Sequence, residues 1–292
     1  MKTGLVLEGG GMRGIYTNGV LDCLMDNGFY SDYVIGVSAG ACGGVSYVSG
    51  QRGRSKRINL GYLDDKRYLG LESLRKTGSM FGMDFLFEEI PNRLDPFDYA
   101  AFLASPIAFV AGVTDVETGK PAYFGKEAMN GTSVVLRASS AIPVFSPAVE
   151  INGRRYLDGG TSDPIPVKKA LEDGCDRLVV VLTRDRSYQK QPEKLRVAYR
   201  RVFRDAPKMI EALDRRHEIY NETLDFLRGL ERRGIAQVIA PGRPVQVGRF
   251  ERDPLRLNAL YKTGMLDAQK FLSRIGWERP TASPVPQAAG EN

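Results

Sequence analysis

Short apolar runs alternate with helical patterns along the first half of the chain. Residues 4–7 and 33–37 are apolar runs of strand length, and each precedes a segment with helical patterning, residues 12–27 and 38–49. The first helix is expected to be amphipathic, and the second is rich in small residues. Further buried strands are expected at residues 107–113, 177–182 and 237–240. The alternation predicts a three-layer α/β/α fold with a mostly parallel central sheet.

The second half of the chain is mainly helical in pattern. Residues 205–233 carry an apolar stripe, and residues 254–275 form another helical segment. The stripe consists of Met209, Leu213, Tyr220, Leu224 and Leu227. We therefore expect a core at residues 1–185 and a helical region at residues 186–279 that packs on the core and completes it. The Pro- and Ala-rich residues 280–292 predict a disordered tail.

The segment SMFGMDFLFEEI, residues 79–90, is crowded with Met and Phe. Core packing is the favoured interpretation, because Met and Phe are ordinary core residues. The alternative is a mobile apolar wall beside an active site that receives an acyl chain.

Composition and segment lengths narrow the class of protein. The 292 residues are 42% hydrophobic and 26% charged, as in folded globular domains. No apolar run approaches the roughly 20 residues of a membrane span, and the N-terminal apolar run is too short for a signal peptide. These features predict a cytoplasmic protein, with peripheral attachment to a membrane as an option.

Charge and metal-ligand content exclude other classes. The net charge is +6, and residues 184–204 are dense in Lys and Arg. A solvated helix face is the favoured interpretation, and contact with anionic lipid head groups is the alternative. Nucleic acid is not expected as a partner, because no base-reading motif accompanies the charge. Three scattered cysteines and a single histidine predict no disulfide framework, metal site or cofactor.

Candidate chemistry begins with Gly36-Val37-Ser38-Ala39-Gly40, which follows the second apolar run. The G-x-S-x-G pattern between a strand and a helix is that of a nucleophile elbow, in which the glycines permit a tight turn. The turn would expose the hydroxyl of Ser38 and place backbone N–H groups at a helix N-terminus.

A second glycine-rich turn, Gly9-Gly10-Gly11-Met12-Arg13-Gly14, follows the first apolar run. Its exposed N–H groups suit either a dinucleotide phosphate or the oxyanion of an acyl transfer. A dinucleotide site requires an acidic residue at the end of the second strand, whereas that strand ends in Ser38 and Asp32 precedes it. The oxyanion interpretation is therefore favoured, with Arg13 adding positive charge or bracing the loop.

A reactive Ser38 needs a base, and histidine is a poor candidate. His217 lies among charged residues in the long helical segment, where a solvent-facing position is expected. Asp158 is the alternative: it follows a predicted hairpin, residues 149–157 with an Asn-Gly turn, and precedes Gly159 and Gly160. A simple Asp-Gly turn without chemistry is the competing interpretation of this segment.

Four motifs taken together resemble the patatin-like phospholipases, a family of lipid acyl hydrolases with a Ser–Asp dyad. They are the loop at residues 9–14, the elbow at residues 36–40, the segment ASSAIPVFSP at residues 138–147, and Asp158-Gly159-Gly160. The resemblance covers roughly residues 4–185. It implies a patatin-like fold with Ser38 as nucleophile and Asp158 as base. It also implies an oxyanion hole from Gly10, Gly11, Met12 and Arg13, with residues 138–147 structural or lining the pocket.

The expected function is a serine acyl hydrolase of the lipase or phospholipase A type, acting on lipid esters. A phospholipid at a membrane surface is one candidate substrate, and the sequence predicts no oligomeric state. Two alternatives stay open. One is an acyltransferase or transacylase that uses the same acyl-enzyme. The other is a non-catalytic module that binds lipid or nucleotide.

Overall fold

The computed structural model describes residues 1–280 and places eight strands in one sheet. Residues 281–292 of the expected tail lie outside the described residues. The sheet order is β5-β6-β3-β2-β1-β7-β8, with β4 paired to β3 outside this path. The parallel strands are β3 (Ala108–Asp115), β2 (Tyr33–Val37), β1 (Thr3–Leu7), β7 (Arg177–Val181) and β8 (Ala236–Ile239). The predicted α/β class with a mostly parallel sheet is confirmed, as is each predicted strand.

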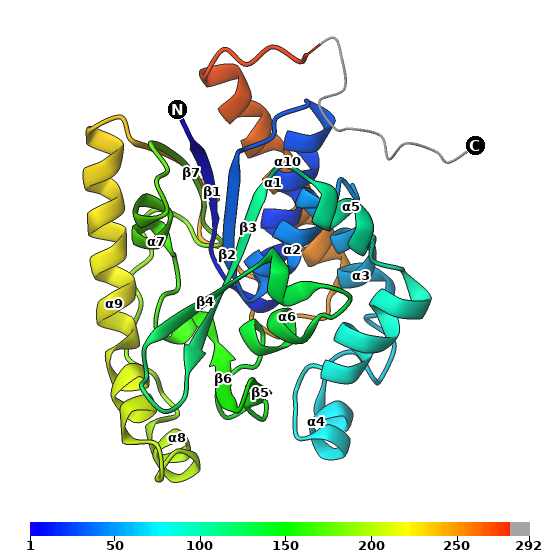
Figure 1. The fold of residues 1–292 in the computed structure, drawn as a ribbon, viewed down its shortest axis with the longest axis vertical. Coiled ribbons are helices and arrows are strands. Elements are labelled where there is room, and N and C mark those ends of the chain that lie inside the picture. Colours follow the sequence, from blue (N-terminus) through cyan, green and yellow to red (C-terminus); the bar gives the residue numbers. More distant parts are fainter. Residues whose placement is uncertain (281–292) are drawn as a thin grey trace.

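Helices cover both faces of the sheet, as Figure 1 shows. One face packs against α1 (Ile15–Asp26), α2 (Ala39–Val48) and α10 (Pro254–Arg274). The other packs against α7 (Val167–Glu172) and α9 (Pro207–Arg232). Side chains of β1 alternate between the two cores, because successive residues of a strand point to opposite faces. The predicted three-layer arrangement is therefore present.

The long strand β3 brings two other strands end to end. β2 pairs with β3 as far as Val37, which lies opposite Gly112. β4 (Pro121–Gly125) occupies one edge of β3 through Thr114. The antiparallel strand β6 (Arg154–Asp158) pairs with the next residues of β3 and therefore lies on the β2 edge, beyond the end of β2. β2 and β6 thus run toward each other, and the residues at their ends meet.

The remaining elements are short. The hairpin predicted from Asn-Gly is confirmed as β5 (Val149–Ile151) and β6. The other elements are η1 (Gly11–Gly14), α3 (Arg54–Gly61), α4 (Leu71–Thr77), the π-helical η2 (Phe85–Leu94), α5 (Tyr99–Ala104), η3 (Lys126–Met129), α6 (Val134–Ser139), η4 (Gly159–Thr161) and α8 (Arg196–Val202).

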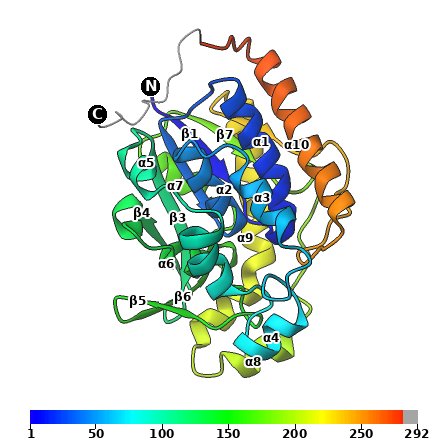
Figure 2. The same cartoon turned by 90° about the vertical axis from the view of Figure 1, so that its right-hand side faces the viewer.

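The expectation of an amphipathic first helix is wrong. Every residue of α1 from Ile15 to Leu24 is buried, including the polar Thr17, Asn18 and Asp22. The reason is that α10 lies along α1 (Figure 2), while α2 and α3 also pack on it. The hydroxyl of Tyr261 on α10 donates a 2.7 Å hydrogen bond to the Asp22 carboxylate, which gives this buried acid a partner.

The C-terminal part of the chain shares the sheet and the core with the N-terminal part. β8 extends the parallel sheet beyond β7. The predicted apolar stripe of α9 is buried, with Tyr220, Leu224 and Leu227 in the core that includes β8 and the first two members, Met209 and Leu213, in the core on the other face. Within residues 1–280, no helix combines the length and the apolar character that crossing a bilayer requires.

Candidate active site

Ser38 lies at the turn between β2 and α2, where the elbow pattern places it. Its backbone has φ 54° and ψ −127°, which residues other than glycine rarely adopt. A strained strand-to-helix turn of this kind is typical of a nucleophile elbow. Gly40 permits it, because a Cβ at this position would lie 2.4 Å from the carbonyl oxygen of Leu7. The first strand and the elbow are thus in direct contact.

The hydroxyl of Ser139 holds the elbow in place. It accepts a 2.8 Å hydrogen bond from the backbone N–H of Ser38 and donates a 2.7 Å bond to the carbonyl of Gly112 on β3. Ser139 is fully buried. Sequence reasoning gave its segment a structural or pocket-lining role, and this side chain braces the strained turn from behind.

Asp158 reaches Ser38 from the opposite direction. Val37 lies opposite Gly112 on β3 and Asp158 lies opposite the next residue, so the end of β6 meets the end of β2. The Asp158 carboxylate accepts a 2.8 Å hydrogen bond from the N–H of Gly160, and both Ser38 and Asp158 line one polar pocket. The Ser38 hydroxyl and the Asp158 carboxylate form no hydrogen bond of standard geometry in this structure. Catalytic hydrogen bonds are often long before substrate binds and shorten when it does.

Burial raises the pKa of Asp158 above its usual range. The Ser38 hydroxyl, the Arg216 charge, the Gly160 N–H and the Arg249 charge act in the opposite direction and favour the carboxylate. A base whose pKa lies nearer neutrality than that of a free aspartate is better matched to taking a proton from a serine hydroxyl. The site therefore strengthens the weak base that sequence reasoning identified.

The glycine-rich loop lies beside Ser38 and offers a narrower donor set than the sequence predicts. The N–H of Met12 donates to the carbonyl of Arg249 at 3.0 Å, and the N–H of Arg13 donates to Gly10 at 3.3 Å. Met12 and Arg13 are therefore unsuitable as backbone oxyanion donors, which corrects that expectation. The N–H groups of Gly10 and Gly11 make no hydrogen bond to a described residue. These two remain as candidate donors.

Most glycines of the predicted site lie where close packing leaves no room for a side chain. Gly11 has φ +57°, and a Cβ there would lie 2.6 Å from the carbonyl oxygen of Arg249. Four further glycines lie where a Cβ would be within 3.1 Å of a neighbouring residue of the site or sheet: Gly9, Gly14, Gly36 and Gly159. Gly160 turns the chain after Asp158, and its carbonyl accepts a 2.6 Å hydrogen bond from the guanidinium of Arg216.

His217 lies on α9 and lines neither pocket at Ser38. The expectation that it faces solvent is only partly correct. The residue is half-buried, and its Nδ1 atom is buried without a hydrogen-bond partner among the described residues.

An apolar cavity of about 120 Å³ opens on one side of Ser38. Its wall includes four side chains of the Met- and Phe-rich segment: Phe81, Met83, Leu86 and Phe87. Met83 and Phe87 are also buried in the main core. Core packing is therefore confirmed for these two residues. The segment also forms an apolar wall beside Ser38, while its mobility and its role in receiving an acyl chain stay predictions.

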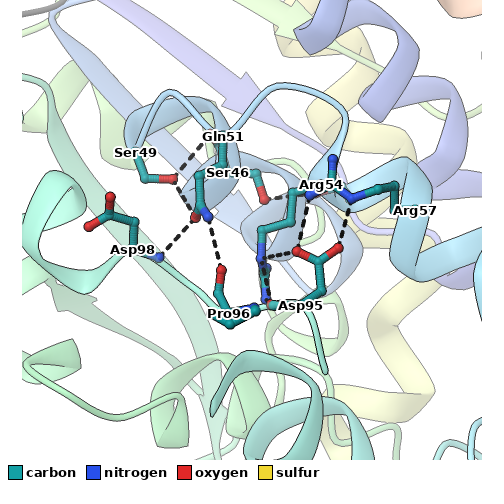
Figure 3. Close-up of polar contacts among 9 residues, drawn as sticks. Ser46, Ser49, Gln51, Arg54, Arg57, Asp95, Pro96 and Asp98 are labelled. Atoms are coloured by element: carbon teal, nitrogen blue, oxygen red, sulfur yellow. Dashed lines mark hydrogen bonds and ion pairs between the residues drawn. The ribbon is translucent and has the colours of Figure 1, made fainter. Parts of the chain in front are cut away.

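Ion pairs tether the wall of this cavity to α3. Asp95, directly after η2, accepts hydrogen bonds at 2.8 and 3.0 Å from Arg57 and lies 3.5 Å from the guanidinium of Arg54 (Figure 3). Arg54 also donates to the backbone carbonyl of Asp95 at 2.8 Å. Gln51 adds a bond to the carbonyl of Pro96 at 3.0 Å. The end of η2 is thus fixed to the helices that follow the elbow.

A second, polar cavity also has Ser38 in its wall, and sequence reasoning missed most of its residues. Glu8 accepts hydrogen bonds from the Thr183 N–H at 2.6 Å and the Tyr220 hydroxyl at 2.8 Å. Burial raises the pKa of Glu8. The sequence could have identified Glu8 as a site residue, because it lies between the first strand and the glycine loop. Ligand-binding sites of α/β proteins lie at the carboxyl ends of their parallel strands. No comparable signal marks Arg216 or Arg249, which come from the C-terminal part of the chain.

Two family models match the chain. A model described as patatin-like phospholipase matches residues 5–171, which include Ser38, Asp158 and the glycine loop. A model described as a domain of unknown function (DUF6363) matches residues 206–277, the segment of α9, β8 and α10.

Relatives match over different lengths. The uncharacterized protein YjjU of Escherichia coli is 31% identical over 94% of this chain and 78% of its own length. An uncharacterized NTE family protein of Mycobacterium tuberculosis is 26% identical over 62% of this chain, and the match spans about half of that protein. The crystal structure of VipD from Legionella pneumophila aligns with a TM-score of 0.48 and 15% identity, over 94% of this chain and 67% of VipD.

Proposed function

The chain belongs to the patatin-like phospholipase family, and on that premise we propose that it is a serine acyl hydrolase that cleaves lipid esters with a Ser38–Asp158 dyad. The observation that carries the proposal is the meeting of the β2 and β6 ends on β3, which directs the Ser38 elbow and the buried Asp158 carboxylate to one pocket. The apolar cavity at the same serine supports a substrate with an acyl chain.

The proposed reaction has two stages. The Ser38 oxygen attacks the ester carbonyl carbon while Asp158 takes the hydroxyl proton, and the N–H groups of Gly10 and Gly11 bind the oxyanion. The tetrahedral intermediate then collapses, and Asp158 returns the proton to the departing alcohol. In the second stage Asp158 takes a proton from water, which attacks the acyl-enzyme carbonyl. The second tetrahedral intermediate then collapses, Asp158 returns the proton to the departing Ser38 oxygen, and the fatty acid leaves. Each oxyanion donor is expected to contribute about 3 kcal/mol to transition-state stabilisation.

Substitution of the dyad tests the proposal. Ser38→Ala is expected to lower kcat for a nitrophenyl butyrate ester by about 10³-fold or more, and Asp158→Asn by about 10²- to 10⁴-fold. Ser38→Ala should also abolish labelling by a fluorophosphonate. Ser273→Ala and Asp64→Asn replace the same residue types at exposed positions and should retain full activity. Full activity in either dyad variant would overturn the dyad.

A further inference from the structure

The polar cavity beside Ser38 is lined by five cationic side chains. They are Arg13, Arg184, Lys190, Arg216 and Arg249, which we call the cationic pocket. They come from the glycine loop, the segment after β7, α9 and the loop before α10, so the folded chain gathers them at one point. The apolar cavity and the cationic pocket share Gly11, Ser38 and Ile142 in their linings and otherwise have separate walls.

The carboxylates of this region do not balance the cations. Glu8 and Asp158 line the pocket, but Glu8 is engaged with Thr183 and Tyr220, and Asp158 with Gly160. Glu193 pairs with Arg216 at 2.6 Å and with Lys190 at 3.6 Å.

Three cations of the pocket have no ion-pair partner within residues 1–280. They are Arg13, Arg184 and Arg249, and the Nε atom of Arg13 is buried without any described hydrogen-bond acceptor. The guanidinium of Arg184 makes one long hydrogen bond, 3.4 Å to the carbonyl of Val245, and lies over the ring of Tyr188, 4.6 Å from the ring centroid. Cations without an acidic partner also occur elsewhere in the described part of the chain, for example Arg232 and Arg233 at the end of α9, but these two are exposed. Arg13, Arg184 and Arg249 are only partly exposed, and all three line one pocket at the nucleophile.

Such a cluster is costly to hold without an anion. Burial and the neighbouring Arg184 lower the pKa of Arg13 to about 10. Burial and the charge of Arg216 lower the pKa of Lys190 to about 7. Burial is the larger cause of both shifts and repulsion between the cations adds to it; a bound anion would offset both effects. Guanidinium groups match phosphate oxygens in planar, two-point hydrogen bonding.

We propose that the cationic pocket binds the phosphate-bearing head group of the substrate, so that the enzyme prefers anionic glycerophospholipids to zwitterionic or neutral ester lipids. This inference rests on the proposed hydrolase function. With the scissile carbonyl at Ser38, the acyl chain lies in the apolar cavity and the head group lies among the arginines on the other side. The glycerol backbone then spans the boundary between the two linings at Gly11 and Ser38.

Soluble short-chain lipids test the preference without a charged membrane surface. The specificity ratio is kcat/KM for dihexanoyl phosphatidic acid divided by that for dihexanoyl phosphatidylcholine, both kept below their critical micelle concentrations. We expect a ratio of about tenfold or more in the parent protein. Arg184→Gln, which removes one cation of the pocket, should lower this ratio about tenfold.

Two further variants control for a general loss of positive charge and for poor folding of Arg184→Gln. Arg243→Gln removes one exposed charge from the loop that carries Arg249 and should leave the ratio unchanged. Lys190→Gln is the second pocket variant, should Arg184→Gln fold poorly in a thermal melt. A ratio near one in the parent protein, or a ratio unchanged in both pocket variants, would overturn the proposal.

A binding measurement separates a head-group site from a free-phosphate site and from failure of the hydrolase itself. The Ser38→Ala protein should bind dihexanoyl phosphatidic acid at least tenfold more tightly than inorganic phosphate. It should also bind dihexanoyl phosphatidic acid more tightly than dihexanoyl phosphatidylcholine, and this difference in Kd should be lost in the double variant Ser38→Ala/Arg184→Gln. Equal or tighter binding of inorganic phosphate would identify a phosphate site and contradict the head-group role. If the parent protein hydrolyses no ester, this titration still decides the anion site independently.

Discussion

At the scale of single residues, the backbone of Ser38 decides how the site is built. A serine with φ 54° is strained, so neighbouring groups must hold it. The Ser139 hydroxyl does so through its two hydrogen bonds, to the Ser38 N–H and the Gly112 carbonyl. Ser139 is therefore a positioning residue for the proposed nucleophile.

We expect Ser139→Ala to lower the free energy of unfolding by about 1–3 kcal/mol, because it leaves two buried backbone groups without partners. It should also lower kcat for a nitrophenyl ester roughly tenfold, because the elbow is no longer braced. Urea unfolding and ester assays measure the two effects. Ser49→Ala is the control: Ser49 is also buried, and its hydroxyl donates to the Ser46 carbonyl or to the Gln51 side chain, at the far end of α2. Equal kcat in the two variants would contradict the positioning role.

The raised pKa of Asp158 predicts the pH dependence of the reaction. The base works as a carboxylate, so activity is lost as the pH falls through its pKa. Because burial raises that pKa, the acidic limb of kcat/KM for a neutral ester should lie above the ordinary aspartate value of about 3.9. Arg249→Gln removes a charge that favours the carboxylate and should move the limb to still higher pH. The limb should not move in Arg243→Gln, and a limb at or below 3.9 would contradict Asp158 as the base.

At the scale of elements, hydrophobic patterning predicts the strands of this chain well and the surroundings of its helices less well. The buried strands are short apolar runs, and their period is visible in the sequence. The buried Asp22 on α1 is partnered by Tyr261 on α10, more than 200 residues later, and no local pattern carries that information. The same limit applies to the site: Ser38 and Asp158 stand in local motifs, whereas Arg216 and Arg249 reach the pocket only through tertiary packing.

The tether between η2 and α3 predicts a coupling between stability and chain-length preference. Asp95→Asn removes the carboxylate that faces the buried Arg54 and the exposed Arg57, and we expect a loss of about 1–3 kcal/mol in the free energy of unfolding. The apolar wall would then be held less firmly, so kcat/KM for a decanoyl ester should fall several-fold relative to a butyryl ester. Asp64→Asn, at an exposed position, is the control. An unchanged decanoyl-to-butyryl ratio would contradict the role of the tether.

At the scale of the whole molecule, the C-terminal part of the chain belongs to the site as well as to the fold. The carbonyl of Arg249 accepts the Met12 N–H, and the Tyr220 hydroxyl bonds Glu8, so the glycine loop is held from residues beyond the patatin-like match. Sequence reasoning expected this region to complete the core but assigned it no chemistry. Its contribution comes through a backbone carbonyl and a tyrosine hydroxyl, neither of which forms a motif.

The crossing of α1 and α10 gives a direct test of this integration. Their backbones approach so closely that a Cβ at Gly264 would lie 2.1 Å from the carbonyl oxygen of Tyr16, and a Cβ at Gly19 would lie 2.1 Å from that of Tyr261. Gly264→Ala should therefore force the helices apart and lower the free energy of unfolding by about 1–3 kcal/mol, despite the better helix propensity of alanine. Gly229→Ala on α9, where a Cβ meets nothing closer than 3.9 Å, should instead stabilise by about 0.5–1 kcal/mol.

Because α1 follows the glycine loop directly, Gly264→Ala should also lower kcat, whereas Gly229→Ala should not. Opposite shifts in urea midpoint, with a kcat loss confined to Gly264→Ala, would show that the C-terminal helix supports the loop. Equal kcat in both variants would limit α10 to a role in stability.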